Sequence, residues 1–131
     1  MPYTYEFSDQ YPLVQVYIRG RDTFSDHIER IERITSDPRW ESNHCVLVDF
    51  SETTDFDIST SDLERIAALQ HQRNETIGSG KMAVVAPTDF VFGLTRMWEA
   101  YMDSEAPSIM QIMVFRNRGN AIEWLGFPIK N

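Results

Sequence analysis

Short apolar runs and amphipathic stretches alternate along the chain. Tyr3, Tyr5 and Phe7 alternate with polar residues, and the apolar run Leu13–Ile18 follows after a turn-forming segment, which together predict a β-hairpin. Three later apolar runs lack strict alternation, which is typical of strands that are covered on both faces or central in a parallel sheet. These three runs cover residues 45–50, 82–86 and 109–115.

Apolar residues three or four positions apart predict four helices, which alternate with these strands. Thr23 with Asp26, and Ser61 with Glu64, have the spacing of capping boxes that begin a helix. On the first helix, Arg30 is expected on the polar face, paired with Asp26. The expected helices cover approximately residues 23–36, 61–76, 90–102 and 118–125.

The resulting element order is β-β-α-β-α-β-α-β-α. An N-terminal β-hairpin followed by βαβαβα units predicts an α/β fold, with a mostly parallel five-stranded sheet, four helices and right-handed crossovers. The first strand is expected to be an antiparallel edge. No internal repeat or linker interrupts the sequence, so residues 1–131 are expected to form a single domain.

The charge of the chain excludes several classes of partner. Its 131 residues have a formal net charge of −8 and a pI near 4.7. Nucleic-acid affinity depends on clustered Lys and Arg, so we expect no nucleic-acid partner. Anionic membrane surfaces are disfavoured for the same reason, and no apolar stretch approaches the ~20 residues of a membrane span. The sequence lacks a secretion signal, and its single cysteine, Cys45, cannot form an internal disulfide, so we expect a cytoplasmic protein.

Segments that look like catalytic or metal-binding motifs depart from them at required positions. Gly78–Lys81 resembles the end of a phosphate-binding loop, but Met82 replaces the required Ser or Thr. Asp55–Ser61 has alternating oxygens like a calcium loop, but Thr60 stands where glycine is needed. The three histidines lack zinc-ligand spacing, and no Gly-x-Ser-x-Gly elbow is present. We therefore expect no cofactor, no metal and no catalytic residue, with weak divalent-cation binding by the acidic loop as the alternative.

Ser59 and Thr60 are candidate regulatory hydroxyls. They precede Ser61, which is assigned to the helix cap, and a cap needs only one such residue. Phosphorylation would add about −1.5 to −2 charges beside Asp57 and Asp62. A phosphate here would act as a repulsive switch on the docking of a partner. The alternative is that these hydroxyls serve helix capping alone.

The expected helix at residues 90–102 has more apolar positions than one buried stripe requires. Phe90, Leu94, Met97 and Tyr101 share one face of it. Two interpretations remain open: a bulky core helix packed on the sheet, or a helix that contacts a second copy or another protein. The interface candidates are Phe92, Met97, Trp98, Tyr101 and Met102.

Several segments match a known family in type and order. They are Val46–Asp49 with the hydroxyl-rich helix start, Lys81–Pro87, Phe92–Met97, Val114–Arg116, and Ala121 with Trp124 and Leu125. With the element order, they resemble STAS domains, the sulfate-transporter and anti-sigma-factor-antagonist family. The resemblance is closer to the stand-alone SpoIIAA-like relatives, which share a fold with Sec14 lipid-exchange domains. It spans about Leu13 to Gly126.

The resemblance implies a place for regulation. In anti-sigma antagonists of this type, a partner kinase phosphorylates a Ser or Thr at the start of the helix after the third strand. Ser59 or Thr60 lies nearest to that position, although Ile58 precedes them and Ser61 stands in place of the usual glycine. Lipid exchange of the Sec14 kind would need a large apolar cavity, for which a chain of this length has little room.

Two classes of function follow. The leading hypothesis is a non-enzymatic STAS-like interaction or regulatory module that binds a protein partner or itself through the loop expected at residues 51–61 and the helix at 90–102. The alternative is a domain that binds a small ligand, or is weakly catalytic, in the crevice at the C-terminal ends of the parallel strands. The polar candidates for that crevice are Asp49, Ser51, Asp89, Arg96 and Arg116.

Overall fold

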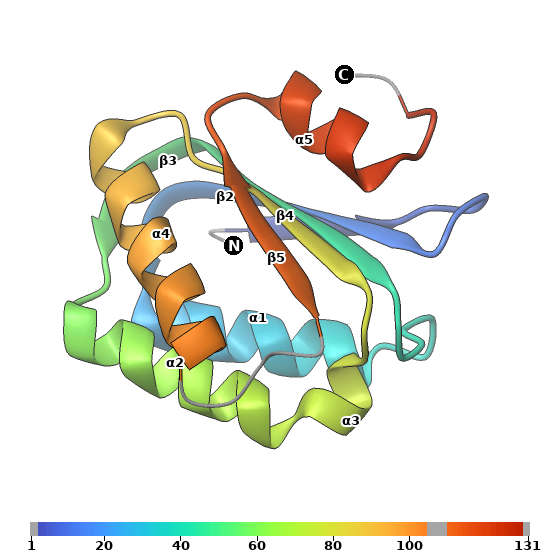
Figure 1. Ribbon diagram of the computed structural model, residues 1–131, viewed down its shortest axis with the longest axis horizontal. Coiled ribbons are helices and arrows are strands. Elements are labelled where there is room, and N and C mark those ends of the chain that lie inside the picture. The colour runs from blue at the N-terminus through green and yellow to red at the C-terminus, as the bar shows by residue number, and fades with distance from the viewer. Residues whose placement is uncertain (1–2, 105–109, 130–131) are drawn as a thin grey trace.

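The computed structural model describes residues 3–104 and 110–129. In these residues, one five-stranded sheet has the order β1-β2-β3-β4-β5 (Figure 1). β1 pairs with β2 in antiparallel register, and the remaining neighbours are parallel. This confirms the predicted hairpin and mostly parallel sheet. The strands are β1 (Tyr3–Phe7), β2 (Leu13–Thr23), β3 (Cys45–Asp57), β4 (Lys81–Val85) and β5 (Gln111–Phe115).

The described residues form five helices instead of the four predicted. The single helix expected at residues 61–76 is divided, because Arg73 leaves the helical conformation with φ −108° and ψ 18°. No helix within residues 3–104 and 110–129 has the length and apolar character needed to cross a membrane. The helices are α1 (Phe24–Ser36), α2 (Thr60–Gln72), α3 (Asn74–Ile77), α4 (Asp89–Ser104) and α5 (Arg118–Leu125).

The helices lie in two layers. α1, α2 and α4 cover one face of the sheet, and α5 covers the other (Figure 1). Successive residues of a strand point to opposite faces, so Val46 and Val84 join the larger core beneath the three helices, whereas Leu47 and Ala83 join the smaller core beneath α5. When parallel strands follow one another in order across a sheet and each crossover is right-handed, the connecting helices all lie on the same face of the sheet.

β2 and β3 continue beyond the other strands as a two-stranded ribbon. The prediction of a loop at residues 51–61 is wrong, because β3 continues to Asp57. Exposed ion pairs cross this ribbon, with Arg19 Nε 3.0 Å from Glu52 Oε2 and Arg21 contacting Asp57. Register shifts between residues 17 and 21 accommodate the bend of β2. The sequence signal is weak here because both faces of the ribbon carry charged residues.

The N-terminus of α2 is capped by Ser59, so the predicted capping box at Ser61 is wrong. Ser59 Oγ accepts a hydrogen bond from the Asp62 backbone N–H at 3.1 Å. The Asp62 carboxylate accepts one from the Ser59 backbone N–H at 3.1 Å. The capping box of Thr23 and Asp26 at the start of α1 is confirmed.

We expect Ser59→Ala to lower the free energy of unfolding by about 1 kcal/mol, because the substitution removes the acceptor that caps α2. Thr60→Ala is the matched control, since Thr60 is exposed in the same turn and its hydroxyl makes no hydrogen bond within the described residues. It should change the free energy by less than about 0.5 kcal/mol. Urea unfolding followed by circular dichroism measures both values. Equal losses in the two variants would contradict the assignment of Ser59 as the cap.

Candidate functional site

The inner face of α4 packs on the sheet and on α2. It consists of the buried residues Val91, Thr95, Trp98 and Met102. Trp98 Nε1–H donates a hydrogen bond to Gln70 Oε1 on α2 at 2.9 Å. The prediction of Trp98 and Met102 as interface residues is therefore wrong, because both side chains lie in the core of their own chain. The sequence pattern alone did not distinguish the inner face of this helix from the outer one.

The outer face of α4 is an apolar stripe that no neighbour among the described residues buries. It consists of Phe90, Gly93, Met97 and Ala100, all of them exposed. The side chain of Phe90 is 64% exposed, and that of Met97 is 38% exposed. Residues three or four apart lie on one side of a helix, so these four form a stripe, and the exposed Arg96 lies beside it between Gly93 and Ala100. Met97 is the one predicted interface residue on this face.

The two remaining interface candidates are half-buried. Arg116 lies over the ring of Phe92, with its guanidinium carbon 4.1 Å from the ring centroid. Phe92 thereby contacts the chain itself and does not belong to the outer face. Tyr101 is half-buried next to Ala100, which places it at the border of the outer face.

Gly93 has no internal reason to be glycine. A Cβ atom added at this position would meet no atom within 4 Å, and the backbone there does not have a positive φ. Glycine inside a helix lowers stability by roughly 0.5–1 kcal/mol relative to alanine. Gly93 therefore makes the helix less stable while leaving a flat notch between Phe90 and Met97 on the outer face.

The five crevice candidates do not form one site. Asp89 and Arg116 make an exposed ion pair of 2.6 Å at the start of α4. Arg96 is exposed on α4. Asp49 and Ser51 instead line a cleft on the α5 face of the sheet. The prediction of a single crevice that contains all five is therefore wrong.

Arg118 organises the cleft that contains Asp49 and Ser51, which has a volume of about 720 Å³. Arg118 Nη1 donates to Asp49 Oδ2 at 3.2 Å, and Nη2 donates to the Tyr17 hydroxyl at 3.2 Å and to Gln15 Oε1. The Ser51 backbone N–H donates to Asp49 Oδ1 at 2.8 Å. The polar side chains at the centre of the cleft thus bind one another and hold the start of α5 against β2 and β3. Sequence reasoning missed Arg118 because 69 positions separate it from Asp49.

A buried ion pair joins β2 to α1. Arg30 Nη1 donates to Asp22 Oδ1 at 2.9 Å, and both side chains are at most 5% exposed. Arg30 Nη2 lies 2.7 Å from Nδ1 of His27. The prediction that Arg30 pairs with Asp26 on the polar face is wrong, because Asp26 takes part in the cap of α1. Nothing in the local pattern distinguishes Arg30 from the exposed arginines of α1.

Burial shifts the pKa values of this cluster. It raises the pKa of Asp22, although the charge of Arg30 acts in the opposite direction. Burial, together with the nearby charge of Arg30, lowers the pKa of His27 well below its usual range. His27 is therefore neutral in the folded protein near neutral pH.

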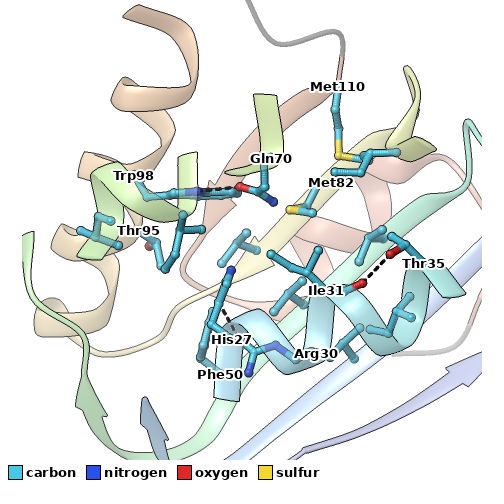
Figure 2. Close-up of a pocket in the computed structure, with 18 of the residues that line it drawn as sticks. His27, Arg30, Ile31, Thr35, Phe50, Gln70, Met82, Thr95, Trp98 and Met110 are labelled. Atoms are coloured by element: carbon cyan, nitrogen blue, oxygen red, sulfur yellow. Dashed lines mark hydrogen bonds between the residues drawn. The ribbon is translucent and has the colours of Figure 1, made fainter. Parts of the chain in front are cut away.

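His27 and Arg30 also line a cavity of about 90 Å³. The cavity lies between the sheet and the layer of α1, α2 and α4 (Figure 2). Its walls are mainly apolar, and they include Ile31, Phe50 and Met82. The volume is small compared with the roughly 150 Å³ of an apolar cavity that accepts benzene, so it does not contain space for a lipid chain.

The regulatory candidates begin α2. Ser59 is exposed, but its hydroxyl is engaged in the cap. Thr60 is also exposed, and within the described residues its hydroxyl makes no hydrogen bond. Of the two hydroxyls, that of Thr60 is therefore the one without a structural role. Regulation through either residue stays a prediction.

Side chains that commonly bind metals are dispersed. In residues 3–104 and 110–129, no three His, Cys, Asp or Glu side chains are grouped so that they could hold a metal ion. His44 Nδ1 instead lies 3.1 Å from the Glu41 carbonyl oxygen, and Cys45 is a free cysteine on β3.

Comparison with known proteins identifies the fold. No family model matches the sequence, and no curated protein matches it. Among solved structures, the chain is similar to an uncharacterized protein of the DUF3478 family with a SpoIIAA-like fold, from Shewanella loihica PV-4. The match covers 94% of this chain and 91% of that one, at 15% sequence identity and a TM-score of 0.57. The protein has a SpoIIAA-like fold, as the sequence predicted.

We expect the free energy of unfolding to fall as the pH falls below about 6.5. In that range the unfolded chain binds a proton at His27 that the folded protein does not bind, because the pKa of His27 is lowered on folding. This contribution is at most about 1.4 kcal/mol per pH unit.

Urea unfolding of the native chain and of His27→Phe between about pH 5 and pH 7.5 measures this contribution. The other titrating groups are common to both proteins and cancel in the difference. The stability of His27→Phe should decline less steeply toward low pH. Parallel pH profiles would show that His27 is protonated equally in the folded and unfolded states.

Proposed function

We propose that this chain is a non-enzymatic SpoIIAA-like interaction module of the cytoplasm and that it binds through the outer face of α4. The observation that carries the proposal is the exposed apolar stripe of Phe90, Gly93, Met97 and Ala100. Large exposed apolar side chains in a continuous patch are typical of protein interfaces. The single free cysteine, Cys45, fits a reducing compartment.

The partner we propose for this face is a second copy of the chain. In an antiparallel pair of α4 helices, Phe90 of one copy would lie opposite Ala100 of the other, and Met97 would lie opposite Gly93. Both pairs share one midpoint along the helix, so a single two-fold axis produces them together. Each pair sets a large side chain against a small one, which is how closely packed helices interlock. The notch at Gly93, which has no function inside the monomer, then accepts Met97.

The charge of the chain limits which surfaces can meet in such a dimer. Two copies that each have a net charge of −8 repel one another at long range. Arg96 and Asp103, both exposed, flank the apolar stripe on α4. Arg96 is paired with Glu99 at 3.3 Å, so the contact brings charges together only at the border of the stripe. Added salt should therefore favour association, because it screens the repulsion and leaves the apolar contact intact.

We expect Ala100→Glu to weaken dimerisation at least about 100-fold, because it places a charge opposite Phe90 in an apolar contact. Ala68→Glu is the matched control, since Ala68 is an exposed alanine on α2 and the change in net charge is the same. Size-exclusion chromatography with light scattering over a range of concentrations measures the dissociation constants. A native chain that is monomeric at all concentrations, or equal effects of the two substitutions, would contradict the proposal.

Gly93→Ala separates folding from association. Alanine should raise the free energy of unfolding of the monomer by about 0.5–1 kcal/mol, since the added Cβ meets no atom of its own chain. The same Cβ narrows the notch for Met97 of the second copy and should weaken the dimer. Thermal unfolding at low concentration and light scattering at high concentration measure the two effects. A variant that is both more stable and equally dimeric would place the interface elsewhere.

A further inference from the structure

The cavity lined by His27 and Arg30 has no part in the proposed role of α4. Its volume of about 90 Å³ exceeds the roughly 10–15 Å³ that one water needs. Ile31, Phe50 and Met82 surround it with apolar surface (Figure 2). Methionine side chains adapt readily to different neighbours, so the wall at Met82 tolerates occupants of different shapes.

Most polar groups in the wall have partners within the chain. The hydroxyls of Thr35 and Thr95 donate to backbone carbonyls of their own helices at 2.7 and 2.9 Å. Gln70 Oε1 accepts a hydrogen bond from Trp98 Nε1 at 2.9 Å. His27 differs from these residues, because its Nε2 atom is buried and has no hydrogen-bond partner among the described residues.

The contact with Arg30 fixes the position of the proton on His27. A guanidinium group can only donate hydrogen bonds, so Nδ1 of His27 accepts from Arg30 Nη2 over their 2.7 Å contact. A neutral imidazole that accepts at Nδ1 carries its proton at Nε2. Nε2 is therefore a hydrogen-bond donor, and Figure 2 shows it pointing into the cavity. Donation from Arg30, which is held by Asp22, polarises the ring and strengthens this donor.

A buried donor without a partner is unfavourable, so the Nε2–H of His27 requires an acceptor. Water fits poorly, because a buried water needs two to four polar partners and apolar cavities stay dry. A carboxylate also fits poorly, because Asp22 already balances the charge of Arg30 and His27 is neutral. An unpaired anion would therefore be buried in an apolar cavity. A carbonyl oxygen on a small hydrocarbon satisfies the donor and matches the walls.

We propose that this cavity binds a small, uncharged, mainly apolar molecule whose carbonyl oxygen accepts a hydrogen bond from Nε2 of His27. The binding site is separate from the outer face of α4 and does not depend on dimerisation.

The direct test compares two probes of the same shape. 2-Butanone has a carbonyl oxygen, and 2-methyl-1-butene has a methylene group in its place. We titrate the ¹⁵N-labelled full chain with each and follow the Nε2 resonance of His27 by NMR. 2-Butanone should produce a saturable shift of that resonance and should bind about tenfold more tightly than the alkene. Equal affinities, or no saturable shift with 2-butanone, would overturn the proposal.

Two variants and a charged probe sharpen the test. His27→Phe should lose the preference for the ketone, whereas His27→Gln, which keeps a donor, should retain part of it. Persistence of the full preference in His27→Phe would overturn the role of this residue. Butyrate that binds as tightly as 2-butanone would overturn the restriction to uncharged molecules.

If His27→Phe does not fold, the comparison of the two uncharged probes on the native chain decides alone. Ala100→Glu should bind 2-butanone as the native chain does. Binding of 2-butanone by this variant would support the cavity proposal whether or not the variant dimerises. The test of the cavity is therefore independent of the test of dimerisation through α4.

Discussion

Right-handed crossovers between parallel strands are the constraint on which the rest of this structure depends. Because β2 to β5 are added in one direction, α1, α2 and α4 must lie on the same face of the sheet. α4 precedes the edge strand β5, and the next helix, α5, covers the opposite face. Among the described residues, no further element follows to cover α4 on its outer side. The exposed stripe that begins at Phe90 is thus a consequence of topology, and the second copy of the chain that we propose would cover it.

The same three-helix layer encloses the buried Asp22–Arg30 ion pair. A buried pair contributes little net stability, but removing one partner leaves an uncompensated charge. Arg30 also lies near the ring of Tyr3, with its guanidinium carbon 5.7 Å from the ring centroid. By donating to His27, Arg30 fixes a neutral ring with its proton directed into the cavity. One ion pair therefore connects β2 to α1 and determines which nitrogen of His27 carries the proton that faces the cavity.

The sequence predicted the parts of the fold that depend on local periodicity. The apolar runs became β3, β4 and β5, and Thr23 capped α1 as its spacing indicated. The failures have a common cause, since they depend on contacts between distant segments. The extension of β3 pairs with β2, whose arginines contact its acidic residues, and the buried Trp98 donates to Gln70 on α2. The outer face of α4 was detected as surplus apolar residues, but which side of the helix is exposed depends on the sheet beneath it.

Disulfide trapping tests the central claim, which is that two copies pair through antiparallel α4 helices. In a Cys45→Ala background, Gly93→Cys and Met97→Cys chains are prepared separately, mixed and oxidised, and the products are counted by mass spectrometry. A disulfide needs Cα atoms about 4.4–6.8 Å apart, a separation that close antiparallel packing provides only between position 93 of one copy and position 97 of the other. The account predicts that the mixed disulfide dominates over both homodisulfides. A statistical mixture of the three products, or no disulfide at concentrations where the native chain is dimeric, would contradict it.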